Sequence, residues 1–436
     1  MLRKIYLAIA LIAFTYSVKA EGYAVNVQGA KQTGMGHVGV AINWDASSMQ
    51  FNPGALATID AKYSLAMGGS LIWTKTEFTS SDYENNATDN PINTPFYLYG
   101  SAKLNDKLAV GLAVYTPFGS SNMWGDNWAG KYLVQDISMK AVYIQPTVSY
   151  KVNDWMSIGA GLNIVYGEFE LNKAFAIQNP ADGSTLADGS ANLSGNTIKY
   201  GYIIGIFLQP NDKLNIGISY RSQVDIELDD SEGEGEFTYP SSIDGIPDAM
   251  TQALIAGYKA AGATDGSFTA TLPLPASLNV GFAYQIDEKW LVSADLNFVE
   301  WSVYKNLEFV SEDAAALNSL NKRNWDDAMT YRVGAQYTAN EKLDLRAGFY
   351  YDETPVQDNY YAPETPGANK IGVTVGASYK LSDKFSLDAA ILYAIGENTK
   401  GYDTNSTSIA YYGEEGFGGK YKNTAIFPTI GITYNF

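Results

Sequence analysis

Few residues in this chain could carry covalent or metal chemistry. Its 436 residues include one histidine, His37, and no cysteine. Disulfides, thiolate metal sites and cysteine nucleophiles are therefore excluded, and any serine–histidine pair would have to use His37. No Gly-x-Ser-x-Gly turn occurs, and no acidic pair stands out as an acid–base couple. We expect no enzyme, no metal and no cofactor, with His37 packed and hydrogen-bonded rather than acting as a pH-sensitive gate.

The charge balance argues against a nucleic-acid partner. The chain has 47 Asp plus Glu and 29 Lys plus Arg. Three of the cations, Arg3, Lys4 and Lys19, lie in residues 1–20, so the rest of the chain carries an excess of 47 − 26 = 21 negative charges. Phosphate binding needs a basic face instead.

Residues 1–20 have the pattern of a secretory signal peptide. Arg3 and Lys4 precede an apolar run from Ile5 to Tyr16, and small residues up to Ala20 suit cleavage. This run is too short for a spanning helix, and no later stretch approaches the roughly 18 apolar residues that one needs. The mature chain is therefore expected to be either soluble outside the cytoplasm or a β-barrel.

Alternating apolar and polar residues predict strands along most of the chain. In residues 278–284, Leu, Val, Phe and Tyr alternate with Asn, Gly and Ala, and the same period recurs in 214–220, 343–351, 371–379 and 385–393. Successive side chains of a strand point to opposite faces. Many apolar faces end in an aromatic residue, which is typical of the girdles of a membrane barrel.

Six short polar turns and seven longer loops separate these runs, which predicts 14 strands. Short turns at one end and long loops at the other are the pattern of an outer-membrane barrel. We predict an all-β fold in which residues 61–436 form a 14-stranded antiparallel transmembrane barrel. The expected strands are 62–73, 95–104, 107–117, 138–151, 155–173, 197–210, 213–228, 273–286, 290–309, 327–339, 342–352, 369–381, 384–396 and 420–436.

Residues 21–60 lack this alternation and are rich in Gly and Ala. Fourteen strands enclose more space than wall side chains can fill. We therefore predict that residues 21–60 form a hatch, a compact plug in the lumen. A disordered tail is the alternative, but Trp44, Met49 and Phe51 argue against it, because disordered segments are poor in such residues.

Several short motifs follow one another along the chain. Residues 45–48 read Asp-Ala-Ser-Ser, residues 52–56 read Asn-Pro-Gly-Ala-Leu and residues 116–119 read Thr-Pro-Phe-Gly. Residues 128–132 read Trp-Ala-Gly-Lys-Tyr and residues 272–275 read Leu-Pro-Leu-Pro. In this order they resemble the FadL family, the long-chain fatty-acid and aromatic-hydrocarbon channels of outer membranes. That family usually has Asn-Pro-Ala-Gly-Leu in the second motif, and an Arg where this chain has Lys131.

The resemblance implies a monomer plugged by an N-terminal hatch, with Asp45, Asn52, Pro53 and Gly54 in the gating segment. It implies capture of a hydrophobic ligand among extracellular loops, passage into the barrel, and lateral exit through the wall beside a kinked third strand. The closing Tyr434 and Phe436 resemble the signal read by the barrel assembly machinery, which would be a partner together with outer-membrane lipid.

The ligand-binding candidates divide into cations, aromatics and one loop helix. Lys131 is the first candidate for a fatty-acid carboxylate, because it replaces the motif's Arg. Arg221, Arg332 and Arg346 project inward by alternation and could serve instead, or could only pair with acids in the lumen. Phe118, Trp124 and Trp128 could line an apolar groove or anchor the interface.

A helix is expected within residues 244–262, where apolar residues recur every four positions. This stripe could bind an apolar ligand or pack on other loops, and it consists of Ile246, Met250, Leu254 and Tyr258.

The sequence therefore predicts an outer-membrane channel for passive, ligand-gated uptake of hydrophobic small molecules, with long-chain fatty acids as the first candidates. An aromatic-hydrocarbon channel and a general porin for polar solutes remain alternatives. The hatch argues against a porin.

Overall fold

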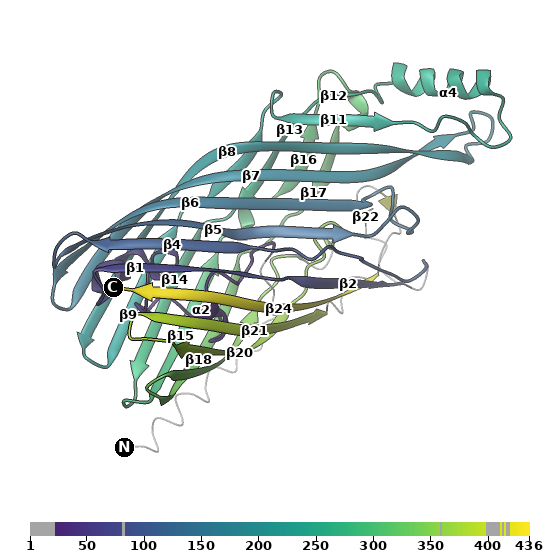
Figure 1. Cartoon of the computed structure of the whole chain (residues 1–436). Helices are drawn as coiled ribbons and strands as arrows, with labels where there is room; N and C mark the ends of the chain where they lie inside the picture. The colour runs from purple at the N-terminus through teal and green to yellow at the C-terminus, as the bar shows by residue number, and fades with distance from the viewer. Residues whose placement is uncertain (1–21, 81–82, 358–359, 398–409, 412–413, 416–418) are drawn as a thin grey trace.

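The computed structural model describes the chain except for residues 1–21, 81–82, 358–359, 398–409, 412–413 and 416–418 (Figure 1). The signal peptide expected at residues 1–20 lies outside the described residues. In the described part of the chain, no helix is long and apolar enough to cross a membrane.

Fourteen antiparallel strands form a closed barrel, as predicted. The first wall strand consists of β1 and β2, and it pairs with the last strand, β24, to close the ring. The wall elements are β1 Tyr63–Ser70, β2 Trp73–Thr79, β4 Phe96–Lys103, β5 Leu108–Met123, β6 Asp136–Asn153, β7 Met156–Gln178, β8 Thr185–Asn211, β9 Leu214–Arg221, β14 Ser277–Gln285, β15 Trp290–Val299, β18 Ala328–Asn340, β19 Leu343–Asp352, β20 Lys370–Lys380, β21 Phe385–Glu397 and β24 Lys420–Asn435.

The predicted short turns join these strands at one end of the barrel. The first residue of each turn accepts backbone hydrogen bonds from residues two or three positions later, as Asn105 and Asn211 do. Such bonds explain why Asn, Asp and Ser begin these turns.

Beyond the opposite end, the wall rises well above the membrane. The outward face of β7 is apolar from Ile158 to Tyr166 and becomes polar at Glu168, which pairs with Lys140 of β6 at 3.1 Å. At about 3.3 Å per residue, the ten residues beyond Glu168 add roughly 33 Å of strand. Figure 1 shows β7 and β8 reaching the distal helix α4, Asp248–Ala260.

Five expected strand boundaries are wrong by six residues or more. The first strand continues as β2 to Thr79 instead of ending at 73. Strand β8 begins at Thr185 rather than at 197, because the β7–β8 hairpin continues above the membrane, where no apolar face is required. The third strand runs to Met123 instead of 117. The expected strands 213–228 and 290–309 end early, at Arg221 and Val299, because the chain then leaves the wall.

The segments that leave the wall build the extracellular part. A four-stranded sheet contains β10 Val224–Leu228, β13 Thr269–Leu274, β16 Asn306–Val310 and β17 Ser319–Lys322. The remaining short elements are β3 Asn86–Ala87, β11 Gly233–Thr238, β12 Gly266–Ser267, β22 Ala410–Tyr411, β23 Glu414–Glu415, and the 3₁₀ turns η2 Trp301–Val303 and η3 Ala315–Leu317.

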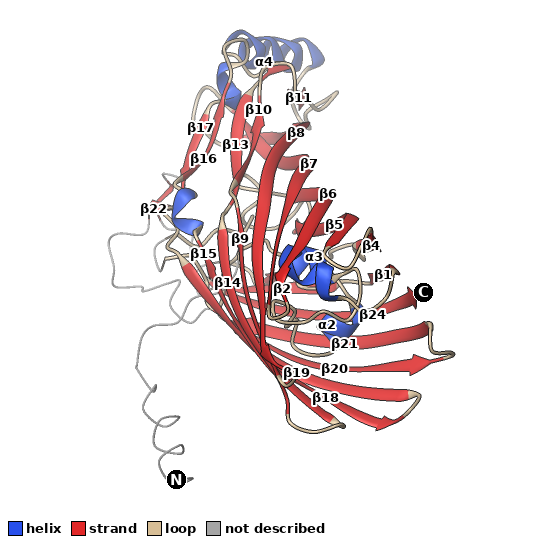
Figure 2. Ribbon diagram, turned by 90° about the vertical axis from the view of Figure 1, so that its left-hand side faces the viewer, coloured by secondary structure: helices blue, strands red, loops and turns tan. Residues whose placement is uncertain are grey.

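The N-terminal segment lies inside the ring of strands (Figure 2). It contains α2 Ala30–Thr33, α3 Ser48–Phe51 and the 3₁₀ helix η1 Pro53–Thr58. Its backbone is held by inward side chains from around the wall, at distances of 2.7–3.1 Å, and these are Ser64, Tyr97, Ser149, Asp295 and Thr374.

Wall glycines provide the space for this segment. A Cβ atom on Gly159 of β7 would overlap the carbonyl of Pro53, and one on Gly348 of β19 would overlap the backbone of Gly36. The hatch therefore packs directly on the backbone of the barrel at these positions.

Candidate functional site

A cavity of about 550 Å³ lies between the hatch and the extracellular part. Its lining includes the buried side chains of Tyr23, Phe118, Trp325, Tyr350 and Leu392. The lining is mixed, because polar residues that include Lys75, Lys140, Asp352 and Lys370 share it with the apolar side chains. Its apolar part suits an apolar ligand, because burial of apolar surface drives such binding.

The wall beside this cavity is interrupted between β4 and β5. Strand β4 pairs with β5 only from Tyr97–Tyr115 to Lys103–Ala109, although β5 continues to Met123. The register of β5 also shifts between Tyr115 and Phe118. Farther along, the N–H of Asp89 donates to the Met123 carbonyl at 2.9 Å, so the interruption is bounded at both ends. We call this gap the window.

The cavity is bounded by residues on both sides of the wall at the window. Its lining includes Ile92 and Phe96, which are 50 % and 47 % exposed on the outer surface, together with the buried Phe118. The cavity therefore extends from the lumen toward the face of the barrel that contacts lipid.

The first described residues of the hatch occupy the unpaired edge of β5. The N–H of Val25 donates to the Pro117 carbonyl at 2.8 Å, and the N–H of Gly119 donates to the Tyr23 carbonyl at 3.0 Å. Ala24 lies opposite Phe118 in this short antiparallel bridge. We call residues 23–25 the latch, because they satisfy backbone groups that β4 leaves unpaired.

Three charged residues that do not line the main cavity lie beyond it on its extracellular side. Arg323 Nη2 is 3.7 Å from Glu364 Oε1, and both side chains are at most 2 % exposed. Lys173 of β7 is close enough to contribute to the electrostatics of Glu364. Burial raises the pKa of Glu364, although Arg323 and Lys173 favour its charged form.

A second cavity of about 20 Å³, little more than the space of one water molecule, lies beside this charged group. Arg323 and Glu364 line it together with Phe169 and Leu272. Four further residues line both cavities, and they are Tyr23, Ser120, Met139 and Thr365. The pair thus lies near the main cavity but does not line it.

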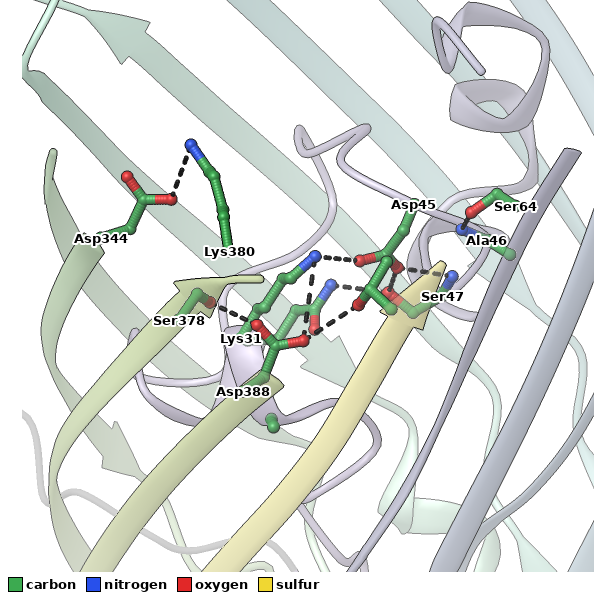
Figure 3. A network of polar contacts seen from close by, with 12 residues as sticks. Lys31, Asp45, Ala46, Ser47, Ser64, Asp344, Ser378, Lys380 and Asp388 are labelled. Atoms are coloured by element: carbon green, nitrogen blue, oxygen red, sulfur yellow. Dashed lines mark hydrogen bonds and ion pairs between the residues drawn. The ribbon is translucent and has the colours of Figure 1, made fainter. Parts of the chain in front are cut away.

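The opposite side of the hatch carries a separate charge network (Figure 3). Lys31 Nζ lies 2.8 Å from Asp45 and 4.0 Å from Asp388 of β21. Ser47 donates to Asp45 through its backbone N–H at 3.0 Å. Burial alone would raise the pKa of Asp45, but Lys31 and Ser47 outweigh it and hold that pKa below its ordinary value.

The residues of the hatch that are expected to take part in gating contact other parts of the hatch or the strands of the wall. Asn52 donates from Nδ2 to the carbonyls of Val40 and Ile206, and it accepts from the N–H of Gly54 at 3.0 Å. Pro53 begins the 3₁₀ helix that Asn52 caps. A Cβ on Gly54 would lie 3.0 Å from the backbone of β8, which explains the glycine at this position.

Of the aromatic ligand candidates, only Phe118 lines the main cavity. Trp124 and Trp128 stack on each other with ring centroids 4.6 Å apart, and both are 4 % exposed. Their indole N–H groups donate to the carbonyls of Pro363 and Val134. They form part of the core of the extracellular loops.

The cationic candidates lie apart from the main cavity. Lys131 pairs with Asp188 at 2.5 Å on the extracellular surface, and this contact raises the pKa of Lys131. Arg221 donates to Tyr115 and to the Gln50 carbonyl.

The other two inward arginines contact the hatch. Arg332 donates to Asn26 at 3.0 Å. Arg346 donates to Gln336 and Ser378 and lies 4.8 Å from the ring of Trp44, so it belongs to the periplasmic side of the hatch. His37 is 4 % exposed and accepts a 3.4 Å hydrogen bond from the Gln28 N–H. Burial, with Arg332 nearby, lowers the pKa of His37 well below its ordinary value.

The expected loop helix forms as α4, but its packed face differs from the stripe. Thr251 and Ile255 are its buried residues, whereas Met250 is 45 % exposed. Tyr258 holds the helix to β7 by donating to the Ala176 carbonyl, while Leu254 is half-buried and Ile246 precedes the helix. A strict spacing of four drifts around a helix of 3.6 residues per turn, which explains the difference.

The last residues close the barrel. Backbone hydrogen bonds join Phe436 to Tyr63, and their rings stack at 5.2 Å. Tyr434 and Phe436 are 39 % and 43 % exposed on the outer face.

Lys173, Arg323 and Glu364 are not among the residues predicted from the sequence. Arg323 and Glu364 lie outside the wall strands, where alternation carries no information about side-chain direction. Only the fold brings them to Lys173, which is 150 residues from Arg323.

Comparisons with known proteins agree with this fold. The family model described as outer membrane protein transport protein (OMPP1/FadL/TodX) matches residues 11–436. An outer membrane protein of Neisseria meningitidis serogroup B is 25 % identical, with 100 % of this chain and 99 % of the relative covered. The long-chain fatty acid transport protein of Escherichia coli K12 is 23 % identical over 90 % of this chain and 92 % of its own length.

Solved structures support the same architecture. A Pseudomonas aeruginosa FadL homologue superposes with a TM-score of 0.80 at 18 % identity, covering 95 % of this chain and 100 % of that one. The Ralstonia pickettii toluene transporter TbuX gives 0.68 at 16 % identity, with 97 % and 100 % covered.

Proposed function

The chain belongs to the OMPP1/FadL/TodX family of outer-membrane transport proteins, and from this premise we propose that it is a passive, ligand-gated channel for long-chain fatty acids. Its location is the outer membrane, and its cargo class is hydrophobic compounds. Fatty acids are the finer proposal, and they are favoured over neutral aromatic compounds by two cations near the cavity, the buried Arg323 and the half-buried Lys173.

The observation that carries this proposal is the continuity of the cavity with the window. A ligand in contact with Phe118 inside and Phe96 outside can remain in apolar surroundings along its path. Each buried CH₂ group contributes about 0.8 kcal/mol, so exposing a long acyl chain to water instead would be strongly unfavourable.

The proposed route has three stages. The extracellular loops first capture the ligand, which then places its carboxylate near Arg323 and Lys173 and its chain in the main cavity. The chain next displaces the latch from β5. Finally it leaves through the window into the membrane. The latch is suited to this role because its bridge to the exposed edge of β5 is short and consists of two backbone hydrogen bonds.

Two further roles follow from the sequence and remain proposals. Asp45, Asn52, Pro53 and Gly54 keep the remainder of the hatch closed to polar solutes. The outward aromatic end of β24 guides the chain to the barrel assembly machinery, and the assembled channel functions as a monomer surrounded by lipid.

Uptake by cells that lack their own fatty-acid transporter tests the proposal. Surface-expressed protein should restore uptake of a labelled long-chain fatty acid, whereas Arg323→Gln at equal expression should reduce it about tenfold, the equivalent of roughly 1.4 kcal/mol. Toluene and a small sugar serve as comparison solutes. Uptake of toluene alone would favour the aromatic alternative, and sugar uptake would favour a porin.

A further inference from the structure

Two lysines line the main cavity where it reaches the outer surface of the barrel. They are Lys75 of β2 and Lys140 of β6, and their side chains are 56 % and 55 % exposed. The other charged residues in the described lining, Asp352 and Lys370, form a register pair between β19 and β20 and do not border the window. Lys75 and Lys140 are therefore the cations that a ligand meets when it leaves the cavity through the wall.

The two lysines lie on opposite sides of the window. On one side, Lys140 is directly opposite Gly119, which belongs to the stretch of β5 that β4 leaves unpaired. On the other side, Lys75 belongs to β2, and the bridge between Ile72 and Asn93 joins this strand to the segment that precedes β4. The window thus has one cation on each side.

Both lysines mark the height at which the outer face of the wall changes from apolar to polar. Along β2, the outward residues change from the exposed Trp73 to Lys75. Along β6, they change from the exposed Ile144 through Val142 to Lys140. Aromatic and then charged residues on the outer face mark the border of the membrane. The two ammonium groups are therefore expected at the level of the lipid head groups.

Each lysine has a glutamate partner that it can exchange for another carboxylate. Lys75 Nζ lies 2.9 Å from Glu77, and Lys140 Nζ lies 3.1 Å from Glu168. All four side chains are at least 40 % exposed. Ion pairs this exposed contribute little to stability, because water screens them. Glu77 also lies 3.8 Å from Lys422, so it keeps a cation nearby when Lys75 turns toward the window.

We propose that Lys75 and Lys140 are positioning residues for the exit step, and that they bind the carboxylate of a fatty acid as its chain passes through the window into the membrane. An unpaired carboxylate is costly to move through apolar surroundings. Cations at the outer mouth of the window offset this cost and leave the carboxylate at the height of the head groups. The inference rests on the proposed function and adds to it the residues that contact the polar end of the ligand at exit.

Uptake of a matched pair of ligands by cells that lack their own fatty-acid transporter tests the proposal. The probes are labelled palmitic acid and its fatty alcohol, which share the chain and differ in charge. In the double variant Lys75→Gln with Lys140→Gln, uptake of the acid should fall about threefold for each lysine, the effect of one exposed ion pair, and thus about tenfold in total. Uptake of the alcohol should stay within about twofold of wild type, because an alcohol carries no charge.

Two further variants control for loss of a lysine as such. Lys75→Arg with Lys140→Arg keeps both charges and should retain most of the acid uptake. Lys199→Gln removes another wall lysine that pairs with a glutamate, Glu227 at 3.9 Å, but does not line the cavity. This matched control should change the uptake of neither ligand.

Binding to the detergent-solubilised protein separates exit from capture. Affinity of the double glutamine variant for palmitic acid should stay within about twofold of wild type, because the lysines act after the ligand has entered. A loss of affinity as large as the loss of uptake would place them in capture and overturn the exit role.

The remaining outcomes also have distinct meanings. Unchanged acid uptake in a surface-located double glutamine variant overturns the inference. An equal fall for acid and alcohol also overturns it, because the lysines would then hold lipid or the wall rather than the ligand carboxylate. If the double variant does not reach the surface, the single variants replace it, and no fall in acid uptake in either has the same meaning. A wild-type protein that takes up neither ligand would instead refute the proposed function.

Discussion

A disulfide between the latch and β5 should close the channel. Ala24 and Phe118 face each other, with the flanking hydrogen bonds Val25–Pro117 and Gly119–Tyr23 on either side. This is the non-hydrogen-bonded type of antiparallel pair, in which Cα atoms are about 4.5 Å apart. That spacing lies within the range of disulfides, roughly 4.4–6.8 Å. Because the chain has no other cysteine, Ala24→Cys with Phe118→Cys can form only this intramolecular bond.

The free energy that holds the latch can be worked out from its contacts. Two backbone hydrogen bonds contribute about 1 kcal/mol each. The ring of Tyr23 packs edge-on against Trp301 with centroids 4.8 Å apart, which adds about 1 kcal/mol. The Tyr23 hydroxyl also donates to the Pro273 carbonyl, which adds about 1 kcal/mol. Opening thus costs roughly 4 kcal/mol, and burial of about five methylene groups at ~0.8 kcal/mol each would offset it. A ligand can therefore open the native latch but cannot break a covalent bond.

The assay is uptake of labelled fatty acid by cells carrying the double variant, before and after reduction. Oxidised cells should show only background uptake, and dithiothreitol should restore at least half of the rate. The two single-cysteine variants control for loss of the Phe118 ring. Full uptake in the oxidised state, with the disulfide confirmed by mass spectrometry, would refute the role of the latch and of the window that it covers.

Three further perturbations test how the hatch is held. Asn52→Ala removes three hydrogen bonds and should destabilise the hatch by about 2–3 kcal/mol, seen as faster hydrogen exchange in residues 40–58; unchanged exchange would contradict the assigned contacts. In Gly159→Ala, the added methyl group overlaps the Pro53 carbonyl. Cells with this variant should become more sensitive to polar antibiotics to which the wild-type barrel is closed, as an antibiotic-sensitivity assay measures. The Asp45–Lys31 contact lowers the pKa of Asp45 below its ordinary 3.8, so its stabilisation is complete above about pH 3.8 and is lost as the pH falls further. Protease protection of the hatch should therefore be equal at pH 7 and 5 and fall near pH 3, and loss already at pH 5 would refute this sign.

The barrel could be predicted because lipid imposes a simple rule on its strands. Outward residues such as Ile158 and Leu162 must be apolar, while their inward neighbours are free to vary. Where the strands leave the membrane this rule no longer applies. The upper part of β8, from Thr185 to Asn196, is therefore indistinguishable from a loop in the sequence.

The charged group near the cavity could not be predicted for a related reason. Lys131 stands in a recognisable motif, yet it pairs with Asp188 at the surface. Arg323 and Glu364 stand in no motif, and their meeting depends on the fold of two loops. The latch was equally hidden, because a backbone bridge of residues 23–25 leaves no requirement on side-chain type.

The most direct test of the central claim is to map where a fatty acid lies while it crosses the protein. Outer membranes containing the channel would be incubated with a long-chain fatty acid that bears a photoreactive diazirine near its methyl end, and the labelled peptides would be identified by mass spectrometry. If the ligand leaves through the window, residues 92–96 and 116–122, on its two sides, should be labelled. Labelling confined to the periplasmic face of the hatch, around Lys31, Trp44 and Arg346, would contradict it and place the exit there.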